Sequence, residues 1–165
     1  MEGFLKLYGE VYQDLYRFAC YYLGNPQDAE DAVQDAALAA WKHFGELKRE
    51  EAFRAWIFQI LVNICRRSLR RKGRYGFLSE DPAKDREAWE KELQEQNLSE
   101  RLEILELLSG LDEEERLIVL LFVFGGYKGE EIAGMLGRRH STIRSRYRRA
   151  LKKLEQALQK KEEKE

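Results

Sequence analysis

Two runs of basic side chains in this 165-residue chain have the composition of surfaces that bind nucleic-acid phosphates. Residues 66–74 contain six Lys or Arg and no acid, and residues 138–153 contain eight and no acid. Between them, residues 79–115 hold fourteen acids against four bases, while the formal net charge of the whole chain is −1. This charge distribution predicts two anion-binding faces joined by a segment that avoids anions. For either run alone, the alternative is an ordinary solvated helix surface.

The second basic run lies on a predicted helix with two different faces. At about 100° of turn per residue, one sector is apolar and the opposite sector carries Ser, Arg and Lys. The apolar sector comprises Ile143, Tyr147, Ala150, Leu151, Leu154 and Leu158. A short helix over residues 129–136 and a turn at Gly137 precede it, which is the helix-turn-helix arrangement. There the second helix enters the major groove, where Arg pairs with guanine and Ser or Thr bonds bases or phosphates.

The DNA contacts expected from this helix-turn-helix divide by position. The whole predicted set is Arg138, Arg139, His140, Ser141, Thr142, Arg144, Ser145, Arg146, Arg148 and Arg149. The first turns and the centre of the polar sector are expected at base edges, through Ser141, Arg144, Ser145 and Arg148. The turn and the other flank are expected at the DNA backbone, through Arg138, Arg146 and Lys153.

The elements that position these side chains are predicted to be helices. No segment alternates apolar and polar residues between turn clusters, and two prolines leave long stretches free to be helical. Apolar residues recur at helical spacing over residues 4–23, 26–44 and 51–72, and again from residue 99. An all-α protein follows, with two small helical bundles of which the second carries the helix-turn-helix.

Glycine, proline and charge suggest where the bundles begin and end. The predicted domains are residues 1–74 and 99–160, joined by a flexible acidic linker over 75–98 that is partly helical or disordered, with a charged tail over 161–165. Within the second domain, Asp112 followed three residues later by Glu115 predicts a capping box at the start of a helix.

Several classes of protein are excluded by composition. Two cysteines and two histidines (Cys20, Cys65, His43 and His140) predict neither a disulfide framework nor a metal site. No nucleotide-binding loop or Ser–His pair stands out, so we expect no enzyme, no cofactor and no small-molecule substrate. No run approaches the roughly 20 apolar residues of a membrane span, and the first residues lack the pattern of a secretory signal. We expect a cytoplasmic protein with no membrane insertion.

Four segments resemble, in order and spacing, those of bacterial sigma-70-family factors. Residues 28–41, DAEDAVQDAALAAW, resemble the core-binding segment DAEDLVQETFLRAW, and residues 53–63, FRAWIFQILVN, resemble FRTWLYRIARN. Residues 130–137, EEIAGMLG, and 142–146, TIRSR, resemble EEIAEILG and TVKSR of the C-terminal helix-turn-helix. The resemblance spans residues 4–154, and the short two-domain length is similar to the extracytoplasmic-function class, group IV.

This resemblance implies a subunit that binds core RNA polymerase and directs promoter-specific transcription initiation. The first domain would melt and read the −10 element, and the second would read the −35 element. The partners implied are the β′ clamp coiled coil and the β subunit of the polymerase, promoter DNA and an anti-sigma factor. The core-binding residues carried over are Asp28, Glu30, Asp31, Gln34, Asp35 and Trp41. The −10 residues carried over are Arg54, Trp56, Asn63, Arg66, Arg67, Arg70, Arg71 and Lys72.

For some of these residues a structural role is an alternative to the functional one. Acids in a first helical turn complement the helix dipole, but Asp35 lies two turns in and is not explained that way. Trp56 also suits the core, and Asn63 could satisfy contacts within its helix. The loop over residues 46–52 corresponds in the family to a pocket for a flipped −10 base.

The chain departs from the family pattern at several positions in its helix-turn-helix. Arg138 stands where an apolar residue is usual, Ser141 replaces a common glycine, and residues 128–129, Lys-Gly, replace Ser-Tyr and remove a good N-cap. In the first domain, Arg67 stands where Asp is common. The alternative function is a stand-alone helix-turn-helix regulator that binds operator DNA as a dimer, but it leaves the first domain unexplained.

Overall fold

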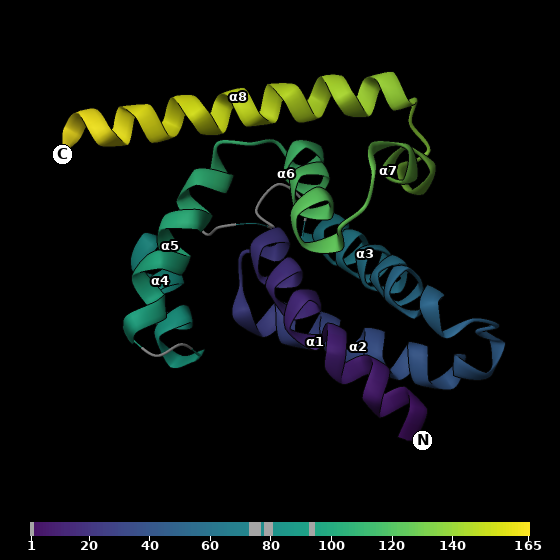
Figure 1. Ribbon diagram of the computed structural model, residues 1–165. Helices are drawn as coiled ribbons and strands as arrows, with labels where there is room; N and C mark the ends of the chain where they lie inside the picture. The colour runs from purple at the N-terminus through teal and green to yellow at the C-terminus, as the bar shows by residue number, and fades with distance from the viewer. Residues whose placement is uncertain (1, 73–76, 78–80, 93–94) are drawn as a thin grey trace. The chain divides into compact units, whose positions relative to one another are not determined.

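The regular elements of the chain are helical throughout the part that the structure describes. A computed structural model describes residues 2–72, 77, 81–92 and 95–165, and its ribbon is drawn in Figure 1. The all-α prediction is confirmed. None of the helices in these ranges is both long and apolar enough to cross a membrane. By its internal contacts the chain divides into two compact units, Met1–Trp89 and Glu90–Glu165.

The first unit is built on three packed helices, α1 (Glu2–Leu23), α2 (Pro26–Lys42) and α3 (Phe53–Lys72). Two short 3₁₀ turns, η1 (Phe44–Glu46) and η2 (Glu50–Ala52), connect α2 to α3. The core side chains on the inner faces recur at helical spacing. The fully buried ones include Leu15, Phe18, Tyr22, Ala29, Ala36, Ile57, Phe58 and Leu61.

A tight turn between α1 and α2 sets the angle of the acidic helix. Gly24 has a φ of +74°, and a Cβ there would collide with the backbone oxygen of Phe77. The Asn25 side chain then accepts hydrogen bonds from the N–H groups of Gln27 and Asp28, at 2.9 and 3.0 Å. Pro26 occupies the first helical position, where its missing N–H costs nothing. The sequence Gly-Asn-Pro therefore ends one helix and starts the next.

The segment predicted as a linker, residues 75–98, contains regular structure. Helix α4 (Pro82–Glu92) lies inside it, and α5 (Glu95–Ser109) begins within its last residues. Trp89 of α4 is fully buried, and the division between the two compact units falls directly after it. Residues 75–76, 78–80 and 93–94 of this segment lie outside the described residues.

The second unit places three further helices after α5: α6 (Glu113–Leu120), α7 (Gly129–Leu136) and α8 (His140–Lys164). The predicted capping box is present, because the Glu115 N–H donates to Asp112 Oδ1 at 2.8 Å and the Asp112 N–H to Glu115 Oε1 at 3.0 Å. Helix α6 ends in a π-helical turn, η4 (Leu121–Gly125). Helices α5, α6 and α7 all contact α8, which extends four residues into the predicted charged tail.

The helix-turn-helix consists of α7, the turn at Gly137 and α8. Gly137 has a φ of +65°, and the Arg138 N–H donates to the Ala133 carbonyl at 3.0 Å, which closes the end of α7. At the start of α7 the Lys128 side chain gives no cap. The Lys128 N–H nevertheless donates to Glu131 Oε1 at 2.9 Å. One of the two hydrogen bonds of a capping box is therefore present, although Lys replaces the usual Ser at position 128.

Candidate nucleic-acid and polymerase interfaces

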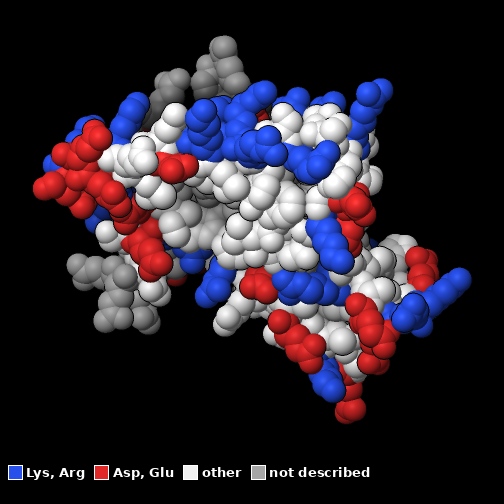
Figure 2. All heavy atoms as spheres, turned by 45° about the horizontal axis from the view of Figure 1, so that its top comes forward, with Lys and Arg blue, Asp and Glu red and all other residues white. Residues whose placement is uncertain are grey.

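The polar face of α8 presents the side chains expected at base edges. Ser141, Arg144, Ser145 and Arg148 are all exposed. Arg139 and Arg149 of the predicted −35 set are also exposed, while His140 and Thr142 are half-buried. Ile143 and Ala150 are fully buried on the opposite face. Figure 2, in which the top of Figure 1 is turned toward the viewer, shows Lys and Arg side chains gathered across the upper part of this face.

The buried face of α8 is rotated relative to the predicted apolar sector. Leu151 and Leu158 were placed in that sector, but they are 44% and 46% exposed. On the other flank, Arg146 is half-buried, and Lys153 reaches Glu115 of α6. The predicted apolar sector is therefore fully buried at Ile143 and Ala150 and exposed at Leu151 and Leu158.

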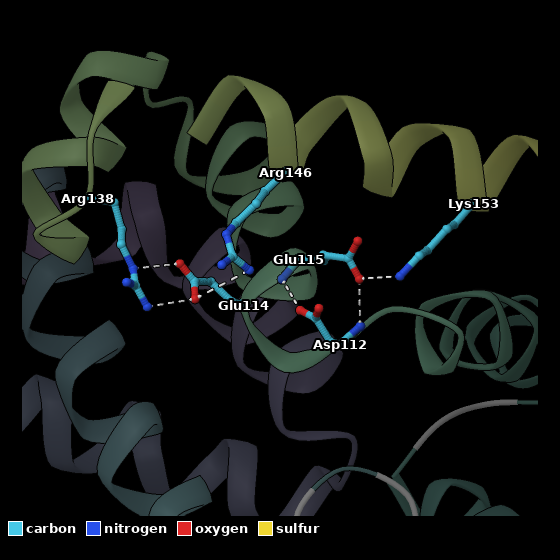
Figure 3. A network of polar contacts seen from close by, with 6 residues as sticks. All are labelled: Asp112, Glu114, Glu115, Arg138, Arg146 and Lys153. Atoms are coloured by element: carbon cyan, nitrogen blue, oxygen red, sulfur yellow. Dashed lines mark hydrogen bonds and ion pairs between the residues drawn. The ribbon is translucent and has the colours of Figure 1, made fainter. Parts of the chain in front are cut away.

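Glu114 of α6 holds two of the predicted DNA contacts. Its Oε1 and Oε2 accept from Arg138 Nε and Nη2 at 3.0 and 3.1 Å, a bidentate pair. Arg146 Nη1 lies 3.8 Å from Glu114 Oε2. Figure 3 shows both guanidinium groups converging on this carboxylate from the turn and from α8. Sequence reasoning missed Glu114, although the unusual Arg138 after the turn glycine was a signal.

Glu115 forms a second link between α6 and α8. Its side chain is 1% exposed, and Oε1 accepts from Lys153 Nζ at 2.7 Å as well as from the Asp112 N–H (Figure 3). A buried carboxylate is stable only with such partners. The same residue that caps α6 therefore also fixes the middle of α8.

The position of His140 explains one more departure from the family pattern. A Cβ on Gly129 would lie 2.9 Å from His140 Nε2. A side chain at position 129 would therefore require the imidazole at the start of α8 to shift. With Gly129 present, the His140 ring lies close to the start of α7.

The acidic face of α2 is exposed at the residues predicted to bind polymerase. Glu30, Asp31, Gln34 and Asp35 are exposed. Gln34 Nε2 donates to Glu30 Oε1 at 3.4 Å. Trp41 is 41% exposed and meets the edge of Phe4 at 5.4 Å between ring centroids. The set therefore forms one surface, acidic along α2 and aromatic at its end.

Asp28, the first residue of that set, is instead paired with a basic residue of α3. Lys72 Nζ contacts Asp28 Oδ2, and burial lowers the pKa of Lys72. The two side chains line a hollow of 390 Å³ between α2 and α3, together with Asp31, Asp35, Ile64, Ser68 and Arg71. An ion pair thus connects the end of α3, which carries the first basic run, to the start of α2.

The other −10 candidates occupy three different environments on α3. Asn63, Arg67, Arg70 and Arg71 are exposed, and Arg66 is half-buried. Arg54 pairs with Asp14 of α1 at 3.1 Å, and its guanidinium lies 5.0 Å from the Phe58 ring centroid. Trp56 is half-buried with its ring 6.0 Å from that of Phe53. The last basic residue of the run, Arg74, lies outside the described residues.

The two cysteines contribute to the core of the first unit. Cys20 and Cys65 are both buried and unbridged, and burial raises the pKa of the Cys65 thiol. Within the part of the chain that the structure describes, no three His, Cys, Asp or Glu residues could hold a metal ion.

Comparison with known proteins gives the same two-part division. Residues 7–75 match the model of Sigma-70 region 2, and residues 101–154 match that of Sigma-70, region 4. The ECF RNA polymerase sigma factor SigM of Mycobacterium tuberculosis is 31% identical over 159 residues, covering 94% of this chain and 77% of the relative. SigL of the same species is 31% identical over 160 residues, covering 93% and 87%.

Two solved structures share the fold. The sigma factor RpoE, crystallised with the anti-sigma factor NepR from Bartonella quintana, gives a TM-score of 0.73 at 25% identity and covers 96% of this chain and 98% of that chain. CnrH in complex with the cytosolic domain of CnrY gives 0.68 at 24% identity and covers 94% and 87%.

A region 2 domain followed by a region 4 domain defines a promoter-specificity subunit. The chain belongs to the ECF sigma factors of the sigma-70 family. It is a subunit that directs RNA polymerase to promoters, and the family consists of regulators of initiation and not of enzymes.

Proposed function

We propose that the two units divide promoter recognition as the predicted residue sets do. The region 2 unit binds core polymerase through α2 and the −10 element through α3, and the region 4 unit reads the −35 element through α8. One observation carries this proposal: each of three helices has an exposed face of a single charge sign. The exposed face of α2 is acidic, whereas those of the end of α3 and of α8 are basic. Residues 75–98 join the two functional domains.

The acidic face of α2 is the docking surface for the β′ clamp coiled coil. Asp31 and Asp35 are exposed, and neither has an ion-pair partner among the described residues. Helix-dipole compensation acts within the first turn and does not account for Asp35. An exposed acidic surface adjoining the aromatic ring of Trp41 suits a basic partner with an apolar contact at one end.

The exposed end of α3 holds the −10 strand. Arg67, Arg70 and Arg71 extend into solvent and supply phosphate contacts, with Asn63 one turn before them for a base edge. The loop over residues 46–52, which receives the flipped base, begins at the last residue of η1 and ends with η2. Arg54 and Trp56 support that pocket from the start of α3.

The exposed face of α8 lies in the major groove of the −35 element. Arg144 and Arg148 pair with guanine edges, and Ser141 and Ser145 lie beside them on the same exposed face. Arg139 and Arg149 contact phosphates on either side, and His140 and Thr142 support the first turn.

An anti-sigma factor completes the set of partners. The two solved structures named above are complexes of a sigma factor with an anti-sigma partner. We extend such a partner to this chain, which works beside the polymerase in the cytoplasm and itself catalyses no reaction. The core-binding face of α2 would then be the surface for which polymerase and the anti-sigma factor compete.

The experiment is in vitro transcription with purified core polymerase on a library in which both promoter elements are randomised. We expect transcripts enriched for one −35 and one −10 sequence at a fixed spacing, and none of them with core alone. A dimeric operator-binding regulator would instead protect DNA without polymerase and yield no enriched transcripts. The variant Asp31→Lys/Asp35→Lys serves as the control that separates core binding from DNA binding.

A further inference from the structure

One carboxylate at the start of α6 controls two arginines of the DNA-reading segment. Glu114 binds Arg138, in the turn before α8, and Arg146, almost two turns into α8 (Figure 3). Its side chain is 19% exposed, compared with 50% for Arg138 and 32% for Arg146. The contact is therefore more shielded than an ordinary surface ion pair.

We propose that Glu114 is a positioning and specificity-determining residue of the −35 reader. It fixes the rotation of α8 through Arg138 and Arg146 and keeps both guanidinium groups off the DNA backbone. The proposal rests on the proposed function, because it takes α8 as the −35-binding helix. It also reassigns Arg138 and Arg146 from DNA contacts to partners of Glu114.

The geometry of the bidentate pair explains the positioning. Two parallel N–H···O bonds fix the direction of the Arg138 guanidinium as well as its distance from Glu114. Arg138 and Arg146 lie on either side of Ile143, the buried anchor of α8. A carboxylate that holds both therefore opposes rotation of the helix about that anchor. An apolar residue at position 138, usual in the family, would fill space without setting this direction.

The effect on specificity follows from charge. A guanidinium that contacts a phosphate strengthens binding to every sequence alike and adds about one to the salt slope. Paired with Glu114, Arg138 and Arg146 add little to that non-specific attraction. The discrimination then depends on the exposed Arg144 and Arg148, which reach base edges. Through this charge effect alone, Glu114 lowers affinity for every sequence alike. The preference for the right sequence depends on the rotation of α8 that Glu114 fixes, because that rotation decides whether Arg144 and Arg148 reach base edges.

The test compares Glu114→Gln with Glu130→Gln in holoenzyme reconstituted from core polymerase and the full chain. Glu130 is an exposed residue in the first turn of α7, so the control makes the same charge change in the same unit. Binding is measured to a labelled promoter duplex with an intact −35 element and to one with a scrambled −35 element, at four salt concentrations. Glu114→Gln should raise affinity for the scrambled duplex several-fold and steepen its salt slope by one to two. The ratio of intact to scrambled binding should fall about tenfold, whereas Glu130→Gln should leave the ratio and the slope unchanged.

Arg138→Leu supplies a second measurement that does not depend on Glu114→Gln folding. If Glu114 holds Arg138 away from DNA, the leucine variant keeps the wild-type salt slope, whereas loss of a phosphate contact would flatten the slope by about one. Equal behaviour of the two glutamine variants, or a flattened slope in Arg138→Leu, would overturn the proposal. Wild-type holoenzyme that binds intact and scrambled duplexes equally would instead contradict the −35 assignment of α8 itself.

Discussion

The two basic runs are alike in being rich in Lys and Arg and free of acids, but they differ in how much of their charge is compensated. On α3, among the described residues 66–72, only Lys72 has an acidic partner, Asp28. On the turn and α8, three of the eight basic residues pair with acids of α6: Arg138 and Arg146 with Glu114, and Lys153 with Glu115. A basic run counted along the chain therefore overstates the charge available to DNA, and it does so more for the second run.

The difference has a structural reason. The end of α3 is a helix terminus with exposed arginines, whereas α8 is docked along α6, whose first turn carries three acids, Glu113 to Glu115. Acids at the start of α6 complement its dipole and also meet the flank of α8. The second run is thus partly a packing surface, and the first is almost wholly a solvent-facing one.

The largest expected effect concerns the acidic face beside the first run. Asp31→Lys/Asp35→Lys should weaken binding to core polymerase by about a hundredfold, because charged pairs across an interface are worth several kcal/mol when one side is reversed. The measurement is a titration of labelled core, with circular dichroism expected to show unchanged helicity. The matched control is Glu2→Lys/Glu10→Lys, which makes the same charge change on exposed residues of α1. Equal loss in both variants would mean that net charge, and not the α2 face, drives docking.

The next largest effect is on the stability of the second unit. Glu115→Ala should lower its free energy of unfolding by about 2–3 kcal/mol, because the change removes half of a capping box and leaves Lys153 without its buried partner. Chemical denaturation followed by circular dichroism measures this loss. Glu130→Ala, an exposed acid in the first turn of α7, is the comparison and should cost well under 1 kcal/mol. A loss no larger than that of Glu130→Ala would show that α6 does not hold α8 through Glu115.

A third prediction tests which charges of the second run reach bases. Arg144→Ala should relax preference at one position of the −35 element, at a cost of about 1–3 kcal/mol on the preferred sequence. Lys152→Ala, also on the exposed face, should weaken all sequences alike and flatten the salt slope by about one. Holoenzyme binding to a randomised −35 pool at two salt concentrations separates the outcomes. A uniform loss in Arg144→Ala would place that side chain at a phosphate.

Sequence patterns predicted the parts of this fold that depend on neighbours along the chain. Helical spacing predicted α1, α2 and α3, the pair Asp112 and Glu115 predicted a capping box, and Gly137 predicted the turn. Helix α4 was harder to foresee, because its residues are mostly polar and show no apolar stripe around the buried Trp89. Assignment of the functional faces came from the resemblance and from charge.

What the sequence could not supply are the contacts between residues far apart in the chain. Glu114 and Arg138 are 24 residues apart, and Asp28 and Lys72 are 44 apart. No local pattern reports such pairs, since they depend on how helices dock. The exposure of Leu151 and Leu158 likewise depends on how α8 docks, which angular positions along one helix do not report.

The smallest effect on DNA binding is expected at Lys72, which among the described residues of the first run is the one paired with an acid. Lys72 is tied to Asp28, whereas Arg71, its neighbour, is exposed and has no acidic partner among the described residues. Arg71→Met should therefore flatten the salt slope of holoenzyme binding to a single strand spanning the −10 element by a little under one. Lys72→Met should flatten it by less than half as much, since Asp28 already neutralises that ammonium.

Stability gives an independent check on the same residue. Loss of a partly exposed ion pair should lower the free energy of unfolding by less than about 1 kcal/mol in Lys72→Met, so both variants can be compared as folded proteins. Equal slopes in the two variants would mean that DNA displaces Asp28 from Lys72 without cost. In that case all the positive charges counted along the first run would interact with DNA phosphates, including the one that is paired with Asp28 in the folded unit. A smaller slope change in Lys72→Met would show that the same effect operates in both runs. In each, acids on a neighbouring helix reduce the positive charge that is available to bind promoter phosphates.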